Sequence, residues 1–552
     1  MNRSLLRYLA ILVCILLVGS LVIGCATTTT PTAGSTPTSS PTEGNATPVP
    51  TEPPADPFGK YEPSISVSTV MFGDNIRNVP EGMTIENNPW LSKFKEYGID
   101  VTYKFVATNA EDMTTKINLA IATDDLPDII PVNSTQYKDL LEADMLADIT
   151  DAYDRYATDE VKNLLNQDGG LMAENAIVDG RRFGIVLPTQ FADYVPVLAY
   201  RADWLEEAGL QPPGSMDDIW NMAKTFKNNK MGGTCVIGIG LTKNVLDLLT
   251  PSVGLFNALH AYSGIWLEKN GTLAYSSIQP EYRDALGMLA NYYAQGLIDP
   301  EFGTKDMKAM WEDAISGRSG VVVSHFCAPF DVINGVKLEQ EWAYSRMFPT
   351  DGQPVKAQNS AAFSGGVVYS AKGMNPEAMI RMYNLYEKFT REDFATYNDN
   401  AVLNFAYPIY VGVVDANPKI YREYNEFITT GTKPAKTTQG FDGVLEAAEK
   451  YRLNQDIEGG YIMYSIFGPE GTEAAVDYAI LNDGYMVSAF TGASTDNMAL
   501  YGANLKTIEE QMVISIIKGD QPIGSFDTFV ADWKANGGDV LTQEVNDWFS
   551  KR

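Results

Sequence analysis

The first part of the chain alternates between two hydrophobic periods. Residues 64–70 (SISVSTV) place apolar and polar side chains in turn, which predicts a strand, and residues 101–106 (VTYKFV) and 127–130 (PDII) predict two more. Between them, residues 89–98 and 113–122 carry apolar side chains at helical spacing. This order predicts a parallel sheet with helices on its faces, in which ligands bind beyond the carboxyl ends of the strands.

The same alternation continues to about residue 390. The predicted strands are 195–200, 235–241, 320–324 and 362–370, and the predicted helices are 201–210, 280–295 and 375–389. Residues 400–552 are mostly helical by pattern. The fold class predicted from the residues is therefore α/β, and no internal repeat is apparent.

The N-terminus combines a basic start with an apolar run. Arg3 and Arg7 precede residues 8–23, which are almost all apolar, a pattern typical of a secretory signal. A membrane-spanning anchor is the alternative, because about 20 apolar residues could just cross a bilayer. The run ends in the sequence VIGC, which resembles the bacterial lipobox. We therefore predict a signal peptide at residues 1–24 and a lipid on Cys25.

The segment that follows is unsuited to a packed core. Residues 26–56 hold Thr, Pro or Ser at 20 of their 31 positions and contain no aromatic residue. Such a segment cannot bury enough apolar surface to offset the entropy of ordering it, and its prolines favour an extended chain. We predict that residues 25–57 form a disordered tether between the lipid and a folded body.

Charge and rare residues exclude several classes of protein. The chain has 70 acidic and 41 basic residues, a net charge of −29 and an isoelectric point near 4.4. Such a protein repels phosphate groups, so nucleic acid is not an expected partner. Two histidines, His260 and His325, cannot build a multi-histidine zinc site. Cys235 and Cys327 are either two buried thiols or a disulfide pair, and the sequence leaves both possibilities open.

Six segments, taken in order, resemble the substrate-binding lipoproteins of bacterial ABC importers. They are IATDDLPDII (121–130), YRADWLEEAGLQPPGSMDDIWNMAKTF (200–226), YRDALGMLANYYAQGLIDPEF (282–302), SGRSGVVVSHF (316–326), AKGMNPEAMIRMYNLY (371–386) and FDTFVADWKANGGDVLTQEVNDWF (526–549). Together they extend over nearly the whole body. The pattern is most similar to the family 1 solute-binding lipoproteins of Gram-positive bacteria, many of which are associated with oligosaccharide uptake.

The resemblance implies an α/β, two-lobe periplasmic-binding-protein-like type II fold with a hinge and an interlobe cleft. Residues 58–190 and 360–400 would form lobe 1, and residues 191–359 and 401–552 would form lobe 2 with a helical C-terminal region. The chain would cross between the lobes near residues 187–194 and again near residues 351–363.

The resemblance also implies a function. The protein would be a monomer on the outer face of a Gram-positive cell membrane, where it captures a small solute such as an oligosaccharide and delivers it to an ABC-transporter permease. It would not be an enzyme and would need no cofactor. A separate ATPase would supply the energy, since the chain lacks a GxxxxGK[ST] loop. Some relatives carry an acidic calcium loop, but residues 227–234 (KNNKMGGT) contain no carboxylate, so no metal site is expected.

The candidate ligand-binding residues are polar or aromatic and follow predicted strands or flank the expected crossings. They are Asp74, Asn133, Ser134, Gln136, Gln190, Asp193, Tyr194, Trp266, His325, Phe326 and Phe363. Sugars are bound by aromatic faces that stack on their C–H side and by polar groups that hydrogen-bond their hydroxyls. Arg and Lys do not cluster at these positions, which favours a neutral oligosaccharide, although peptides and glycerol-type solutes stay open.

Two other functional classes stay open. A secreted glycoside hydrolase would need two carboxyl groups roughly 5–9.5 Å apart, and among 70 acidic residues some pair can always be nominated. The sequence has neither a GxSxG nor an HExxH motif. A sensor or adhesin ectodomain would use the same cleft and tether without import.

Overall fold

A computed structural model gives the fold of most of the body. It describes residues 55–72, 82–188, 194–247, 250–359, 363–393, 407–438, 440–455 and 458–551. The chain separates into two units, residues 1–53 and residues 54–552, and all the described residues belong to the second. Asp74, Gln190, Asp193 and the lipidation residue Cys25 lie outside the described residues. Among the described helices, none is long and apolar enough to cross a membrane.

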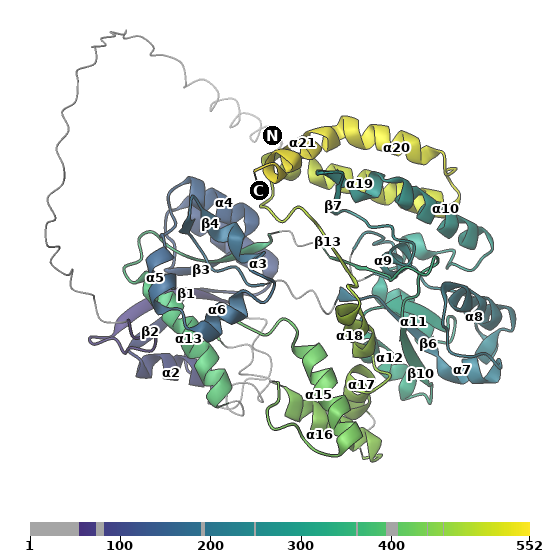
Figure 1. The fold of residues 1–552 in the computed structure, drawn as a ribbon, viewed down its shortest axis with the longest axis horizontal. Coiled ribbons are helices and arrows are strands. Elements are labelled where there is room, and N and C mark those ends of the chain that lie inside the picture. The colour runs from purple at the N-terminus through teal and green to yellow at the C-terminus, as the bar shows by residue number, and fades with distance from the viewer. Residues whose placement is uncertain are drawn as a thin grey trace, which may run out of the picture. The chain divides into compact units, whose positions relative to one another are not determined.

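One group of elements comes from the N-terminal third of the chain and from a later return (Figure 1). Its members are β1 (Ile65–Phe72), α2 (Pro89–Glu96), β2 (Ile99–Ala107), α3 (Ala110–Ala122), β3 (Ile129–Asn133), α4 (Ser134–Glu142), α5 (Thr150–Tyr156), α6 (Asp159–Leu165), β4 (Ile177–Val178), β5 (Arg181–Arg182), β12 (Gly365–Tyr369) and α13 (Pro376–Glu392). The predicted strands and helices of residues 64–130 are all present, with ends that differ by a few residues.

Helix α2 illustrates why these residues fold as they do. The side chain of Asn88 accepts a hydrogen bond from the backbone amide of Leu91 at 3.1 Å, which satisfies an otherwise unpaired donor of the first turn. Pro89 follows at the first helical position, where its missing N–H costs nothing. Trp90 and Phe94 lie one turn apart and are fully buried. The helix is therefore set by its cap and by its apolar face.

The predicted parallel sheet is confirmed for β1 and β2 and is wrong for β3. Strands β1 and β2 pair in parallel from Ile65 opposite Ile99. Strand β3 instead pairs antiparallel with β12, a strand from more than 200 residues further along the chain. Side chains join β3 to β1, because the amide and hydroxyl of Ser68 donate to Asp128 Oδ2 at 2.7 and 2.6 Å. By backbone pairing these strands thus form two separate pairs, one parallel and one antiparallel.

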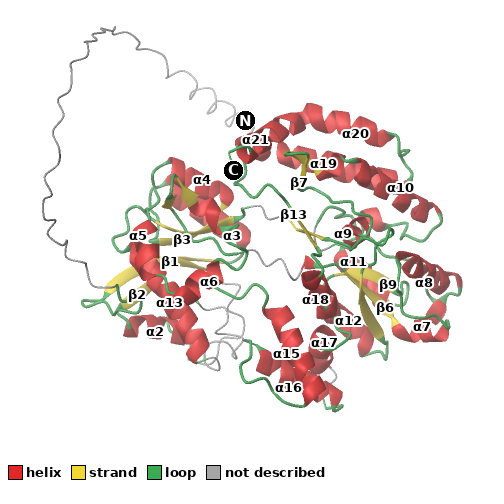
Figure 2. Cartoon of the chain, in the orientation of Figure 1, coloured by secondary structure: helices red, strands yellow, loops and turns green. Residues whose placement is uncertain are grey.

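A second group of elements comes from the middle and the end of the chain (Figures 1 and 2). Its members are β6 (Val197–Arg201), α7 (Ala202–Glu207), α8 (Met216–Asn228), α9 (Pro251–Asn257), β7 (Trp266–Lys269), β8 (Thr272–Tyr275), α10 (Pro280–Ala294), α11 (Met307–Ile315), β9 (Val321–Ser324), α12 (Ala328–Val336), β10 (Trp342–Arg346), β11 (Ala357–Asn359), α15 (Ala416–Thr430), α16 (Phe441–Arg452), α17 (Glu458–Phe467), α18 (Glu473–Leu481), β13 (Tyr485–Val487), α19 (Asp496–Lys518), α20 (Ser525–Trp533) and α21 (Asp539–Phe549). Strand β6 lies between β10 and β9 and is antiparallel to both.

The strand expected at residues 235–241 is not continuous. Only isolated bridges form there, between Ile237 and Ser319, between Ile239 and Ile298, and between Gly240 and Val322. The intervening Gly238 passes very close to its neighbour, since a Cβ at this position would lie 2.3 Å from the carbonyl oxygen of Leu297. The backbone is therefore extended and close to its partners without forming a regular ladder.

The buried side chains divide into two sets, each made by one group of elements. The first set packs residues between Val67 and Ile185 with α13, and it also includes Ile409 and Val411. The second set packs residues between Val195 and Ala357 with helices α15–α21. Ile409 and Val411, which the sequence assigned to lobe 2, pack with the first set, and the lobe ranges stay a prediction.

Candidate functional site

A cavity of about 1000 Å³ lies beside helices α11 and α12, at the carboxyl end of strand β9. This volume is at the upper end of the range for small-molecule sites. Its apolar lining includes Met307, Trp311 and Ile315 from α11 and Phe330 from α12. Tyr194, one of the sequence-predicted ligand residues, also lines it. We call this space the α11–α12 cavity.

His325, a second predicted ligand residue, lines the same cavity directly after β9. Its ring nitrogen Nδ1 accepts a hydrogen bond from the backbone amide of Cys327 at 3.3 Å. Burial lowers the pKa of His325, so the ring is neutral near pH 7. With Nδ1 acting as the acceptor, the proton resides on Nε2, which can donate to a ligand hydroxyl.

Two aromatic side chains give the cavity flat apolar surfaces. Trp311 is 5% exposed and packs edge-to-face on Trp342, with ring centroids 6.2 Å apart. Its indole N–H has no hydrogen-bond partner among the residues that the structure describes. Phe330 is 48% exposed, which is unusual for so large an apolar side chain in a cavity wall. Exposed aromatic rings of this kind are the surfaces on which sugar rings stack.

Three carboxylates line the cavity, and they differ in their partners. Asp247 forms an ion pair with Lys506 at 3.0 Å, and Glu312 pairs with Lys308 at 3.8 Å. Asp331 has no hydrogen bond or ion pair with any residue that the structure describes. Burial raises the pKa of Asp331 to about 6. Among the described lining residues, Asp331 is therefore the carboxylate that is largely ionised at neutral pH without a cationic partner.

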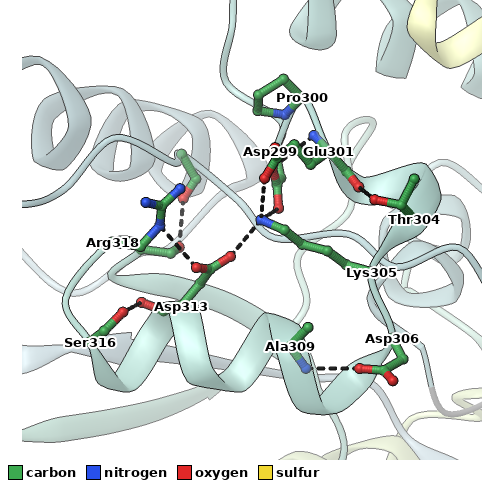
Figure 3. Close-up of polar contacts among 12 residues, drawn as sticks. Asp299, Pro300, Glu301, Thr304, Lys305, Asp306, Ala309, Asp313, Ser316 and Arg318 are labelled. Atoms are coloured by element: carbon green, nitrogen blue, oxygen red, sulfur yellow. Dashed lines mark hydrogen bonds and ion pairs between the residues drawn. The ribbon is translucent and has the colours of Figure 1, made fainter.

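Helix α11 is held in place by a buried ionic cluster around Lys305. The ammonium group of Lys305 lies 2.7 Å from Asp299 and 2.6 Å from Asp313, and Arg318 Nε is 2.9 Å from Asp313 (Figure 3). Burial lowers the pKa of Lys305, but the hydrogen bonds to the two carboxylates outweigh it and the pKa is raised. Because Asp313 belongs to α11, the cluster fixes the helix that carries Trp311.

The predicted polar residues after β3 serve to start helix α4. Asn133 accepts a hydrogen bond from the amide of Gln136 at 2.9 Å, and the side chain of Gln136 accepts one from the amide of Asn133 at 3.1 Å. The amide group of Gln136 also donates to Asn118 Oδ1 at 2.7 Å, and the side chain is buried. Ser134 lies between them, and its amide donates to the carbonyl of Ser364. Capping thus accounts for Asn133 and Gln136.

The three predicted aromatic ligand residues other than Tyr194 are packed against protein. Trp266 is 6% exposed and lies edge-to-face against Tyr275 in the second set of buried residues. Phe363 is 3% exposed and lies edge-to-face against Tyr137 in the first set. Phe326 is half-buried, and its carbonyl accepts a hydrogen bond from Thr472 Oγ1 at 2.7 Å. The structure does not bring these rings to the α11–α12 cavity.

Sequence reasoning missed most of the cavity wall. Trp311, Phe330, Asp331 and Asn334 were not among the candidates, although α12 begins only four residues after β9 ends. The rule that ligands bind beyond the carboxyl ends of strands could have extended the search from His325 into this helix. Nothing in the sequence indicates that α11 lies opposite.

A second, smaller cavity of about 570 Å³ lies near β7 and β13. Its lining includes His260, whose Nε2 is 3.0 Å from Asp351, and Lys269, which is 3.1 Å from Glu281. Three of its charged lining residues, His260, Lys269 and Lys356, each have a carboxylate partner. Its aromatic lining residues, Tyr262 and Tyr282, are buried, so among the described lining residues it has no exposed aromatic ring like that of Phe330.

The structure also bears on cysteines and metals. Cys235 and Cys327 form no disulfide with each other, and burial raises the pKa of the Cys235 thiol to about 11. Within the described part of the chain, no three or more His, Cys, Asp or Glu residues gather as metal ligands would. In the segment expected to lack calcium, the ammonium of Lys227 donates to the carbonyl of Gly296.

These features define a class of protein. Two groups of packed α/β elements, between which the chain passes more than once, are typical of a two-lobe solute-binding protein. The described lining of the α11–α12 cavity comes from the second group alone, so this cavity is not the interlobe cleft that the resemblance implies. Residues 78–372 match the family model of the bacterial extracellular solute-binding proteins, and the chain belongs to this family.

Curated relatives agree with this assignment. Lipoprotein LipO of Bacillus subtilis is 22% identical over 497 residues, which span 84% of this chain and 88% of that protein. The polygalacturonan/rhamnogalacturonan-binding protein YtcQ of Bacillus subtilis is 21% identical over 321 residues, or 55% of this chain and 59% of that protein.

Solved structures confirm the α/β two-lobe fold. An HMO-binding, ABC-transporter-associated solute-binding protein from Bifidobacterium longum infantis has a TM-score of 0.61 at 13% identity, covering 88% of this chain and 98% of its own. FusA of S. pneumoniae, an ABC-transporter substrate-binding protein solved with kestose, has a TM-score of 0.56 at 14% identity, covering 88% and 99%. The fold predicted from the resemblance is thus confirmed.

Proposed function

We propose that this protein captures an oligosaccharide in the α11–α12 cavity and delivers it to the permease of an ABC importer. The observation that carries the proposal is the pairing, in one cavity, of the exposed ring of Phe330 with the neutral hydrogen-bonding group of His325. The ring supplies a stacking surface, and the imidazole and the nearby Asn334 supply partners for hydroxyl groups. Family membership supports a role in solute binding.

The names of similar proteins support a saccharide as the solute. YtcQ is named for binding polygalacturonan and rhamnogalacturonan, and FusA was solved with kestose. A volume of about 1000 Å³ suits an oligosaccharide better than a single small metabolite. We further propose that Tyr194, which lies beside the expected first crossing, contacts the ligand together with His325.

The cell-surface part of the proposal rests on the sequence. The signal-like residues 1–24 and the lipobox-like ending at Cys25 support a lipid anchor, and residues 25–57 would hold the body away from the outer face of the membrane. LipO, the relative that matches most of the chain, is named a lipoprotein. Cys25→Ala should move the protein from the membrane fraction into the medium, and its continued retention in the membrane would contradict the lipid anchor.

A thermal-shift screen with neutral oligosaccharides tests the binding function. A ligand that binds only the folded state should raise its stability by about 2.7 kcal/mol at a hundredfold excess over Kd. Phe330→Ala should weaken the binding of any saccharide found by about 1 kcal/mol, or roughly fivefold, because a stacking surface is lost.

Leu338→Ala is the matched control. Leu338 is also an exposed, large apolar residue, it follows α12 directly, and it is not part of the cavity lining. Equal effects of the two substitutions would contradict stacking on Phe330. Release of new reducing ends from a bound oligosaccharide would instead favour a glycoside hydrolase.

A further inference from the structure

We infer that Asp331 makes the α11–α12 cavity select neutral saccharides and reject those that carry carboxylates. The inference rests on the proposed function, because it concerns the ligand of the same cavity. It assigns a specificity-determining role to one side chain and separates this chain from relatives that are named for binding uronate polymers, such as YtcQ.

The first step of the argument is the position of Asp331 on helix α12. The residue lies in the first turn of the helix, the end at which the helix dipole is positive. The amides of Ala328 and Phe330 already donate to the carbonyls of His325 and Cys327, and Pro329 has no N–H, so the positive end of the dipole is what would attract an anion here. Asp331 supplies a negative charge at this end from within the protein, so a bound anion would find the site already occupied by a like charge.

The second step concerns the cations around the cavity. Lys308 is the only Lys or Arg among the described lining residues, and it is paired with Glu312. Lys506, which lies outside the lining, is paired with Asp247. Each of these ammonium groups already has a carboxylate partner. A uronate in the cavity would therefore face Asp331 without a cation that is available to compensate both charges.

The third step is the chemistry left for a neutral ligand. His325 is neutral near pH 7 and can donate from Nε2, and Asn244 and Asn334 both donate and accept through their amides. The carboxylate of Asp331 accepts hydrogen bonds from hydroxyl groups, and such charge-assisted bonds are stronger than neutral ones. The same group therefore improves the binding of sugar hydroxyls while it repels sugar carboxylates.

The test compares matched trisaccharides on the purified full chain at pH 8, where Asp331 is ionised. The pairs are galactotriose with trigalacturonate and mannotriose with trimannuronate, and the Kd of each is measured by titration calorimetry. For the wild type we expect the neutral member of a pair to bind at least about tenfold more tightly than its uronate, because two carboxylates within a few ångströms repel each other.

Asp331→Asn keeps the shape of the side chain and removes its charge. Asp331→Asn should reduce the ratio of uronate Kd to neutral Kd by at least about tenfold, mainly by improving uronate binding. The positive end of the α12 dipole would then no longer face the carboxylate of Asp331. Asp532→Asn is the control, because Asp532 is exposed on α20, does not line the cavity and gives the same change in net charge. This control should leave the preference unchanged.

The outcomes separate the role of Asp331 from the proposed function. Equal or tighter binding of the uronate by the wild type would overturn the role of Asp331 while leaving saccharide capture intact. Equal effects of Asp331→Asn and Asp532→Asn would also overturn it, since the preference would then follow net charge. Failure of every neutral and uronate member to bind the wild type would overturn the proposed function and this inference together.

Discussion

Glu509 provides a sharp test of the electrostatics of the second set of buried residues. It lies on α19, its side chain is 0% exposed, and Oε2 accepts a hydrogen bond from the hydroxyl of Tyr275 at 3.1 Å. Burial raises its pKa from 4.5 to about 7, and the hydrogen bonds from neighbouring hydroxyls oppose the shift only in part. Glu509→Gln should therefore remove a carboxylate that is costly to ionise inside the protein.

The magnitude follows from the difference between the folded and unfolded pKa values. A shift from 4.5 to about 7 corresponds to about 3 kcal/mol at 1.36 kcal/mol per pKa unit. Because the folded pKa is the higher one, the folded state holds its proton more tightly. The contribution of Glu509 to the free energy of unfolding is therefore constant below pH 4.5. It falls as the pH rises from 4.5 to 7 and is constant again at higher pH. Glu509→Gln should remove this fall.

The assay is urea unfolding of the wild type and of Glu509→Gln at half-unit intervals between pH 5 and pH 8. The stability of the variant relative to the wild type should rise by about 2 to 3 kcal/mol across this range. Any constant cost of the new amide cancels in the comparison between pH values. Glu510→Gln is the control, since Glu510 is the next residue, is partly exposed and pairs with Lys506 at 3.7 Å. A relative stability that does not change with pH, or one that changes equally in the control, would refute the reasoning.

Two further substitutions test the packing that positions the cavity. Lys305→Met should destabilise the protein by about 3–5 kcal/mol, because Asp299, whose side chain is 2% exposed, would be left without its ammonium partner. Lys308→Met, on the exposed surface of α11, should change the unfolding free energy by less than about 1 kcal/mol. Similar losses in both variants would contradict a special role for the cluster. Gly238→Ala should destabilise the protein, because the new Cβ would lie 2.3 Å from a backbone oxygen. Gly443→Ala inside α16 is the control, because its new Cβ has no neighbour within 4 Å. It should raise the free energy of unfolding by about 0.5–1 kcal/mol. Thermal unfolding of both variants should therefore show shifts of opposite sign, and shifts of the same sign would contradict this view of the backbone.

Local features of the fold could be predicted from the sequence because their causes are local. The cap at Asn88 and the apolar face of α2 are fixed by residues within two turns, and the alternation at β1 is read directly from the chain. The antiparallel pairing of β3 with β12 depends on residues more than 200 positions apart. No short-range pattern carries such information, so the direction of that pairing was predicted wrongly.

The candidate site could be predicted only where a rule linked position to function. His325 follows a buried strand, which made it a candidate under the strand-end rule, and it lines the α11–α12 cavity. Trp266 and Phe363 show the limit of composition, because an aromatic side chain that packs in a core has the same sequence signal as one that faces a ligand. Asn133 and Gln136 follow a strand as expected, but their hydrogen bonds are used by the helix they begin. The position of α11 opposite α12 depends on tertiary packing.

The ionic cluster around Lys305 has a consequence for the selectivity of the binding site proposed here. Since Asp313 and Asp299 hold α11 through contacts within the protein, the wall that carries Trp311 has its shape before a ligand arrives. A rigid wall loses little conformational freedom on association, so the affinity reports the fit of the sugar itself. Differences in ligand preference between related proteins would then be expected in the side chains of α12. The ion pairs that hold α11 would stay the same.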